Sequence, residues 1–183
     1  MASDMIPARR ERAELCELFL ELGPDEPTLC GDWTTRDLAA HLVVRERRPD
    51  AAIGIVISKA AGYTDKVQAG VAESEWADLV DTVRSGPPIW SPTKIGAVDK
   101  LANTVEFFVH LEDVRRAQPT WEPRALDDDL TDTLYKVLGT MAKRLVKGSD
   151  VGIVLEPTDD HEPIVAKDAE PSVTVRGSVG ELV

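Results

Sequence analysis

Apolar residues recur at three- and four-residue spacing along most of the first 148 positions, a pattern that predicts helices. The clearest apolar stripes run through residues 8–22, 34–48, 97–117 and 127–148, and residues 51–84 are expected to form one or two further helical pieces. Thr34 followed by Asp37 approximates a capping box, which places a helix start there. Gly23 and Pro49 mark the ends of the first two helices. The chain is therefore expected to be mainly helical.

The pattern changes to alternation after residue 149, and alternation is typical of strands. The alternating apolar positions are Val151, Ile153 and Leu155, then Ile164 and Ala166, then Val173 and Val175. Helices followed by three short strands predict an α+β protein, mainly α, in which an antiparallel helical bundle carries a small sheet. We expect a helical unit over 1–148 and a small β-rich segment over 149–183, the latter as the beginning of a second domain.

Charge and composition narrow the function classes. The 183 residues include 21 Lys and Arg against 33 Asp and Glu, a formal net charge of −12 that repels phosphate backbones and argues against nucleic acid as a partner. No apolar stretch approaches the roughly 20 residues of a membrane span, and no apolar run typical of a secretory signal follows the first arginines. We therefore expect a cytoplasmic protein in which Cys16 and Cys30 are reduced thiols.

The strongest chemical signal is a polar stripe on an otherwise apolar helix. Asn103, Glu106, His110 and Asp113 follow helical spacing, and burying them is costly unless something satisfies them. Glu106 and His110 project from adjacent turns, and His41 on an earlier helix can complete a set of three ligands. Imidazole and carboxylate suit zinc, and three protein ligands leave a position open for water or substrate. The sequence therefore predicts a metal site formed by His41, Glu106 and His110.

Each of these residues also has a simpler interpretation. A histidine on an apolar helical face is commonly a hydrogen-bonded core residue, and Glu106 with His110 can be an ordinary charge pair. Asp113 can accept a hydrogen bond from a ligand imidazole or can be a solvated acid. Arg45 and Arg115 are candidate contacts for an anion. Alternatively, Arg45 complements the C-terminus of its helix, and Arg115 is a solvated surface charge.

Two segments carry a family resemblance. GDWTTRDLAAHLVVRERRPDAAIG at 31–54 and NTVEFFVHLEDVRRAQPTWEPR at 103–124 together resemble the mycothiol-dependent maleylpyruvate isomerase family, within the DinB-like superfamily of metal-binding four-helix bundles. The flanking runs are most similar to an uncharacterised actinobacterial metal-binding subgroup. The resemblance implies a DinB-like bundle with His41 as the first ligand, Glu106 and His110 as the others, and zinc as the usual metal. Residues 151–176 resemble the start of the isomerase's second, sterol-carrier-like domain.

Three hypotheses of function follow. The first is a zinc-dependent transferase or isomerase that uses mycothiol and acts on a small electrophilic substrate. The second is a non-catalytic metal-binding module for sensing or interaction, whose metal would have a fourth protein ligand. The third is a metal-free bundle in which Glu106 simply pairs with His110. The expected partners are a small-molecule substrate and a low-molecular-weight thiol, with a homodimer as a candidate assembly.

Overall fold

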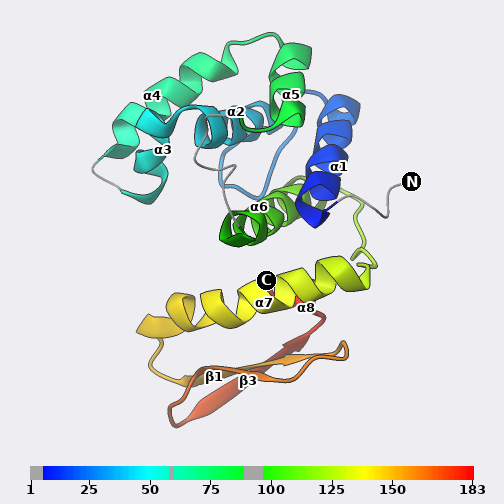
Figure 1. The fold of residues 1–183 in the computed structure, drawn as a ribbon, viewed down its shortest axis with the longest axis vertical. Coiled ribbons are helices and arrows are strands. Elements are labelled where there is room, and N and C mark those ends of the chain that lie inside the picture. The colour runs from blue at the N-terminus through cyan, green and yellow to red at the C-terminus, as the bar shows by residue number, and fades with distance from the viewer. Residues whose placement is uncertain (1–5, 58–59, 89–96) are drawn as a thin grey trace.

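The helices up to residue 116 form the upper layer of the molecule (Figure 1). The structure is a computed structural model that describes residues 6–57, 60–88 and 97–183. The helices of this layer are α1 (Pro7–Leu22), α2 (Thr35–Arg47), α3 (Pro49–Val56), α4 (Ala61–Ala72), α5 (Trp76–Ser85) and α6 (Ala97–Arg116). Because α3, α4 and α5 are separate, the segment over 51–84 holds three helices and the expectation of one or two pieces was wrong.

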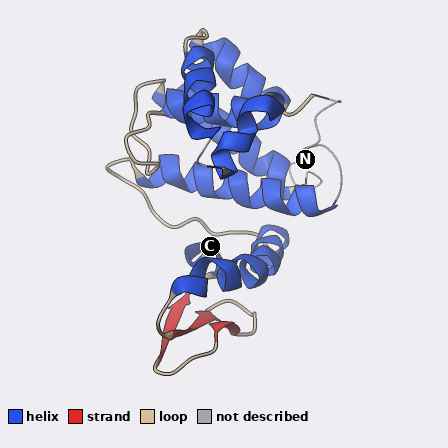
Figure 2. Cartoon of the chain, turned by 90° about the vertical axis from the view of Figure 1, so that its left-hand side faces the viewer, coloured by secondary structure: helices blue, strands red, loops and turns tan. Residues whose placement is uncertain are grey.

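The second layer consists of one long helix on a small sheet (Figures 1 and 2). Its elements are α7 (Asp128–Leu145), a single 3-10 turn η3 (Val146–Gly148), β1 (Gly152–Pro157), β2 (Ile164–Lys167), β3 (Ser172–Gly177) and the short α8 (Val179–Leu182). The strand order is β2-β1-β3, with β1 antiparallel to β2 and parallel to β3. The predicted α+β class, mainly helical with three C-terminal strands, is confirmed.

Side-chain caps explain where several helices begin. Thr34 and Asp37 form the predicted capping box: the Thr34 amide donates to the Asp37 carboxylate at 3.0 Å, and the Asp37 amide donates to Thr34 Oγ1 at 3.4 Å. Asp127 accepts from the amide of Leu130 at 2.9 Å at the start of α7. Glu75 caps α5 in the same way, and this cap was not recognised in the sequence.

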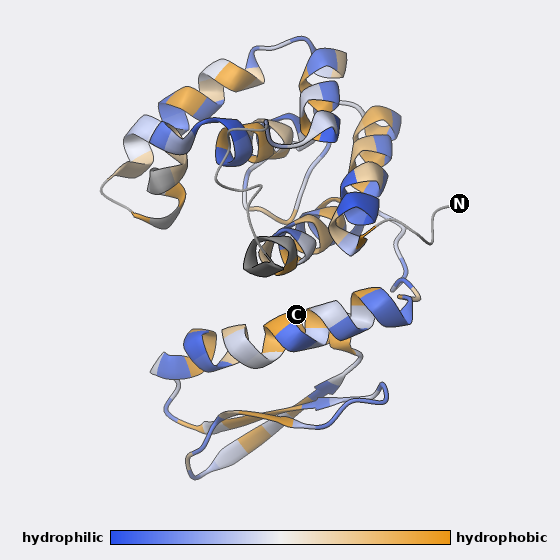
Figure 3. Cartoon of the chain, in the orientation of Figure 1, coloured by the Kyte–Doolittle hydropathy of each residue, from blue (hydrophilic) through white to orange (hydrophobic). Residues whose placement is uncertain are grey.

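The core of the upper layer unites α1, α2, α5 and α6. Its largest fully buried side chains include Phe19, Leu38, Leu79 and Phe107. Figure 3 shows hydrophobic positions alternating with hydrophilic ones along these helices, as amphipathic packing requires. Burial of this apolar surface is the main force that holds the four helices together.

Helix α6 is buried on two sides. Phe107 and Leu111 belong to the core of the upper layer, whereas Val105 and Phe108 pack in a second cluster with Leu130 of α7. Farther along α7, a third cluster that comprises Leu138, Ala142, Leu155 and Ala166 joins this helix to β1 and β2. Helix α7 therefore contacts both α6 of the upper layer and the sheet of its own layer. Among the described helices, none is long and apolar enough to cross a membrane.

A network of buried and half-buried charges joins the two layers at one end of α6. Arg124, in the connection between α6 and α7, donates to Glu11 of α1 at 2.6 Å and to Glu112 of α6 at 2.7 Å. Arg116 also donates to Glu112, at 2.8 Å. Burial raises the pKa of Glu112, but hydrogen bonds from its arginine partners outweigh burial and leave this pKa below its usual range.

The substitution Glu112→Gln tests this network. A lowered pKa in the folded state means that ionised Glu112 stabilises the fold above its unfolded pKa of about 4.3, and that this stabilisation is lost as the pH falls through the folded value. At pH 7 the substitution should lower the free energy of unfolding by on the order of 3 kcal/mol, because it leaves half-buried arginines short of a charge partner. The deficit should shrink at acidic pH. Urea unfolding at both pH values measures it.

The matched control is Glu14→Gln, since Glu14 also binds Arg124, at 2.9 Å, but its side chain is 57% exposed. The control substitution should lower the free energy of unfolding by less than about 1 kcal/mol. A Glu112→Gln deficit that is the same at both pH values, or no larger than that of the control, would contradict the assignment.

Candidate metal centre

His41 lies in the buried part of α2. The residue is 7% exposed, and Leu38 and Leu42 of the same helix are fully buried in the core. The ring of Trp33, from the loop before α2, lies 5.0 Å from the His41 ring between centroids. The imidazole is therefore held between an aromatic ring on one side and α6 on the other.

Glu106 and His110 approach His41 from α6. Glu106 Oε1 lies 3.7 Å from His41 Nε2 and 3.4 Å from His110 Nε2. The two imidazole rings are 5.5 Å apart between centroids, and the three potential ligand atoms all lie within 4.8 Å of one another. The structure thus brings together the three side chains that the sequence analysis selected from two helices.

The spacing of these atoms fits a tetrahedral zinc site. Zinc bonds to nitrogen and oxygen are about 2.0–2.2 Å long, so neighbouring ligand atoms in a tetrahedron lie about 3.3–3.6 Å apart. The two separations from Glu106 Oε1, 3.4 Å and 3.7 Å, are close to these values, and the ligand atoms of the two imidazoles lie within 4.8 Å of each other. Two histidines and one glutamate are also a known ligand set for catalytic zinc. The donor set and the two separations from Glu106 are therefore compatible with zinc.

Arg45 supports the carboxylate of Glu106 from the next turn of α2. Its Nε lies 3.0 Å from Glu106 Oε1, and its Nη1 donates to Asn103 Oδ1 at 2.8 Å. Burial raises the pKa of Glu106, but its hydrogen bonds to both imidazoles and the charge of Arg45 outweigh burial and hold this pKa well below its usual range. Glu106 is consequently an anion at neutral pH, as a metal ligand must be.

His110 has a second set of partners on its other ring nitrogen. Its Nδ1 lies 3.0 Å from Asp113 Oδ2, and the same oxygen accepts from the thiol of Cys30 at 3.1 Å. A carboxylate only accepts hydrogen bonds, so Nδ1 carries the hydrogen and Nε2 faces Glu106. An imidazole that ligates a metal usually has such a carboxylate behind it. Asp113 therefore occupies the supporting position that the sequence analysis considered for it.

The charges around His110 also set its protonation without metal. Burial lowers the pKa of His110, but hydrogen bonds with Asp113, Cys30 and Glu106 outweigh it and raise this pKa to about 11. For Asp113, burial raises the pKa and the bonds from His110 and Cys30 lower it below its usual range. The metal-free centre is thus an imidazolium between two carboxylates, and Nε2 must lose its proton before it can bind an ion.

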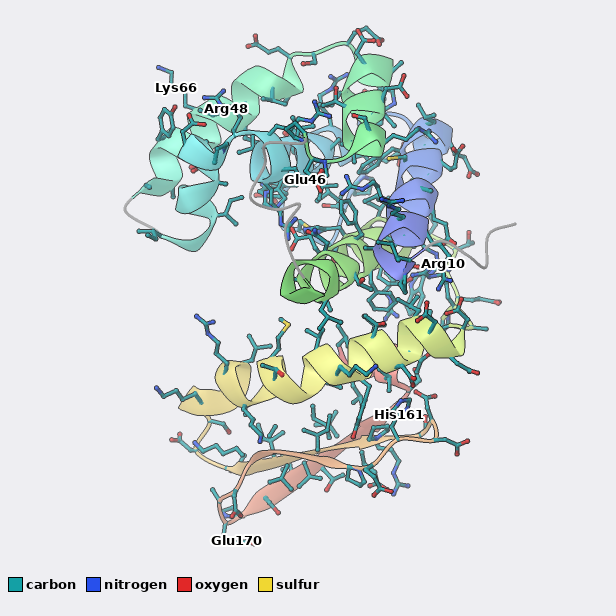
Figure 4. The ribbon with its side chains drawn as sticks, viewed as in Figure 1. Arg10, Glu46, Arg48, Lys66, His161 and Glu170 are labelled. Carbon is teal, nitrogen blue, oxygen red and sulfur yellow. The ribbon has the colours of Figure 1, made fainter. Side chains whose placement is uncertain are left out.

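Other candidate residues lie in different surroundings. Arg115 donates to Glu112 at 2.7 Å and to the carbonyl oxygen of Glu122 at 2.9 Å, so it belongs to the charge network around Arg124. The third histidine of the chain, His161, lies beside the sheet (Figure 4), where its Nε2 is 3.1 Å from Asp132 Oδ1.

From the sequence, Cys30 is a candidate redox or ligand thiol close to the helix of His41, with a structural role as the alternative, and no pattern relates it to His110. It belongs to no recognised ligand spacing and lies 80 residues from His110, so only the fold brings the two together. The one local signal is its position in the short loop just before the helix that carries His41.

Comparison with known proteins adds no relative: no family model, curated protein or solved structure matches this chain. The class of protein is therefore described from its own geometry. It is an α+β, mainly helical protein with a cluster of two histidines and one glutamate between α2 and α6.

The substitution Asp113→Asn tests the charge balance around His110. In chelator-treated protein, removal of the carboxylate should lower the pKa of His110, because the imidazolium loses an anionic acceptor. Long-range proton–nitrogen NMR spectra recorded from about pH 6 upward report its protonation. The control is Asp132→Asn, which removes the carboxylate next to His161 instead. An unchanged His110 titration in Asp113→Asn would contradict the assigned balance.

Proposed function

We propose that this protein binds one zinc ion through His41, Glu106 and His110 and uses it in thiol-dependent chemistry on a small electrophilic substrate. The observation that carries the proposal is the convergence of three ligand atoms from two helices to within 4.8 Å of one another. The supports around the ligands, Arg45 on Glu106 and Asp113 on His110, are those expected behind metal-binding side chains.

The chemistry would come from an open position at the metal. A zinc ion held there would act as a Lewis acid and lower the pKa of a thiol or water that binds to it. The reaction class is thiol transfer or thiol-dependent isomerisation, with mycothiol as the thiol that the family resemblance suggests. The chain's own residues bind and orient: the two imidazoles and Glu106 set the position, and Arg45 supplies a positive charge beside it.

The number of ligands favours catalysis over a purely structural or sensing role. Within the described residues, the group around Glu106 contains three side chains of ligand type, which leaves a tetrahedral ion one further position, and Cys30 and Asp113 form a second group of ligand type with the same His110. A non-catalytic module, the rival hypothesis, would close that position with a fourth protein ligand.

The finer fold and the location of the protein are also part of this proposal. We assign α1, α2, α5 and α6, which share one core, as the four helices of a DinB-like bundle. We further propose that the protein acts in the cytoplasm, where thiols stay reduced.

Metal loading tests the site directly. Wild-type protein that is stripped with chelator and reloaded with zinc should bind about one equivalent, measured by elemental analysis after desalting. Substitutions behind metal ligands typically cost about 10- to 100-fold in affinity, so His41→Ala and Glu106→Gln should each cost at least about 100-fold. His161→Ala is the control and should bind like wild type. Absence of tight zinc binding in the wild type would refute the proposal in favour of a metal-free Glu106–His110 pair.

The role of Arg45 as an anion contact has its own test. In cobalt-loaded protein, mercaptoacetate and 2-mercaptoethanol present the same thiol with and without a carboxylate, and visible spectra report their binding. Arg45→Gln should weaken the binding of mercaptoacetate at least about tenfold and leave the binding of 2-mercaptoethanol unchanged. The reason is that a hydrogen bond to a charged group contributes about 1.5–3 kcal/mol.

Cobalt stoichiometry is measured first in every variant, since Arg45 also contacts Glu106. The matched control is Arg48→Gln. Arg48 lies at the same end of α2 as Arg45 but pairs with Asp50. Equal effects of the two substitutions, or equal loss of both thiols in Arg45→Gln, would show that Arg45 does not recognise the carboxylate.

A further inference from the structure

One short loop contacts both histidines of the candidate centre. Trp33 lies against the His41 ring, with centroids 5.0 Å apart, and Cys30 Sγ lies 3.8 Å from His110 Nδ1. The loop is held at both of its sides: the Leu29 amide donates to the carbonyl oxygen of Asp113 at 3.1 Å, and Pro27 and Thr34 form an isolated β-bridge. The position of Cys30 relative to α6 is therefore fixed by backbone hydrogen bonds.

Within the loop, the thiol of Cys30 points at the support of His110. Its Sγ donates to Asp113 Oδ2 at 3.1 Å, and this oxygen also accepts from His110 Nδ1 at 3.0 Å. The Cys30 amide donates to Thr28 Oγ1 at 3.1 Å, which restrains the residue further. Two donors that converge on one carboxylate oxygen restrict its rotation. The orientation of His110 consequently depends on a thiol from a different segment of the chain.

We propose that Cys30 is a positioning residue of the metal centre: its thiol orients Asp113, Asp113 orients His110, and covalent modification of Cys30 therefore weakens metal binding. This inference rests on the proposed metal site. It assigns that site a sensitivity to thiol-modifying reagents, which the three ligands alone do not have. Loss of an outer-shell contact of this kind typically lowers metal affinity about 10- to 100-fold.

The two cysteines of the chain differ in the way that this proposal requires. Cys30 is half-buried and lies in a loop, whereas Cys16 is 0% exposed within the core of the upper layer. Burial raises the pKa of Cys16 to about 11, which keeps its thiol protonated and unreactive at neutral pH. A small thiol reagent applied to the folded protein should therefore modify Cys30 selectively.

Methyl methanethiosulfonate provides a balanced modification. The Cys30 sulfur attacks the sulfenyl sulfur of the reagent, a new S–S bond forms, the bond between sulfur and the sulfonyl group breaks, and methanesulfinate leaves while the thiol proton passes to buffer. The product carries an S-methylthio group in place of the S–H donor. Asp113 then loses one of its two hydrogen bonds at Oδ2 and gains a bulky neighbour.

The experiment measures cobalt affinity and the visible spectrum of the cobalt-loaded protein. Wild type treated with the reagent should take up one methylthio group per chain, by mass spectrometry, and lose at least about tenfold in affinity. A phosphine reductant should restore it. Cys30→Ala should show the same loss without treatment, whereas Cys30→Ser, which keeps a donor, should stay within about threefold of wild type and ignore the reagent. Cys16→Ala is the control for a lost cysteine and should still respond to the reagent.

Unchanged cobalt binding in both modified wild type and Cys30→Ala would overturn the inference while leaving the metal site intact. An equal loss in Cys30→Ser and Cys30→Ala would also overturn it, because the effect would then not follow the donor.

If untreated wild type binds no cobalt, the proposed function fails, and the role of Cys30 is decided in metal-free protein. In that protein, the Nδ1 proton resonance of His110 should shift in Cys30→Ala and lie at its wild-type position in Cys30→Ser. No shift in Cys30→Ala would overturn the positioning role.

Discussion

The centre of this protein depends on one half-buried carboxylate. The Glu106 side chain is only 25% exposed, and a carboxylate in such a place is costly unless positive or hydrogen-donating groups surround it. His41 and Arg45 from α2 and His110 from α6 fulfil that requirement. The attraction between the two helices at this point is therefore polar, in contrast to the apolar packing around it. A divalent cation would satisfy the same carboxylate in place of the protonated imidazole.

The packing of α6 explains why the polar residues face α2. Two sides of this helix carry large apolar side chains, Phe107 toward the upper core and Phe108 toward α7. The remaining direction carries Glu106, His110 and Asp113. Because α7 is in turn held by the sheet beneath it, the β-rich segment contributes indirectly to the orientation of α6. The lower layer thus supports the centre without providing any of its three candidate ligands.

The surroundings of His110 combine segments that are distant in sequence. Asp113 is three residues away on the same helix, so its contact follows from helical geometry alone. Cys30 reaches the same carboxylate from a loop 83 residues earlier. The loop also brings Trp33 to His41, so a single segment restrains both imidazoles. Any metal site here would therefore be sensitive to changes in a loop that carries none of the three predicted ligands.

Much of this could be predicted from sequence because the physics is local. Hydrophobic periodicity placed α1, α2, α6 and α7 and the three strands, and helical spacing put Glu106, His110 and Asp113 on one stripe. The separation of α5 from α4 escaped it, because the Glu75 cap is a weak signal.

The rest required tertiary structure. Periodicity shows which face of a helix is apolar, but it does not say which helix will cover it or which loop will close over it. The meeting of His41 with Glu106 and the contact of Cys30 with Asp113 were decided only when α2, its preceding loop and α6 packed together, because such contacts depend on the relative placement of segments that no local pattern encodes.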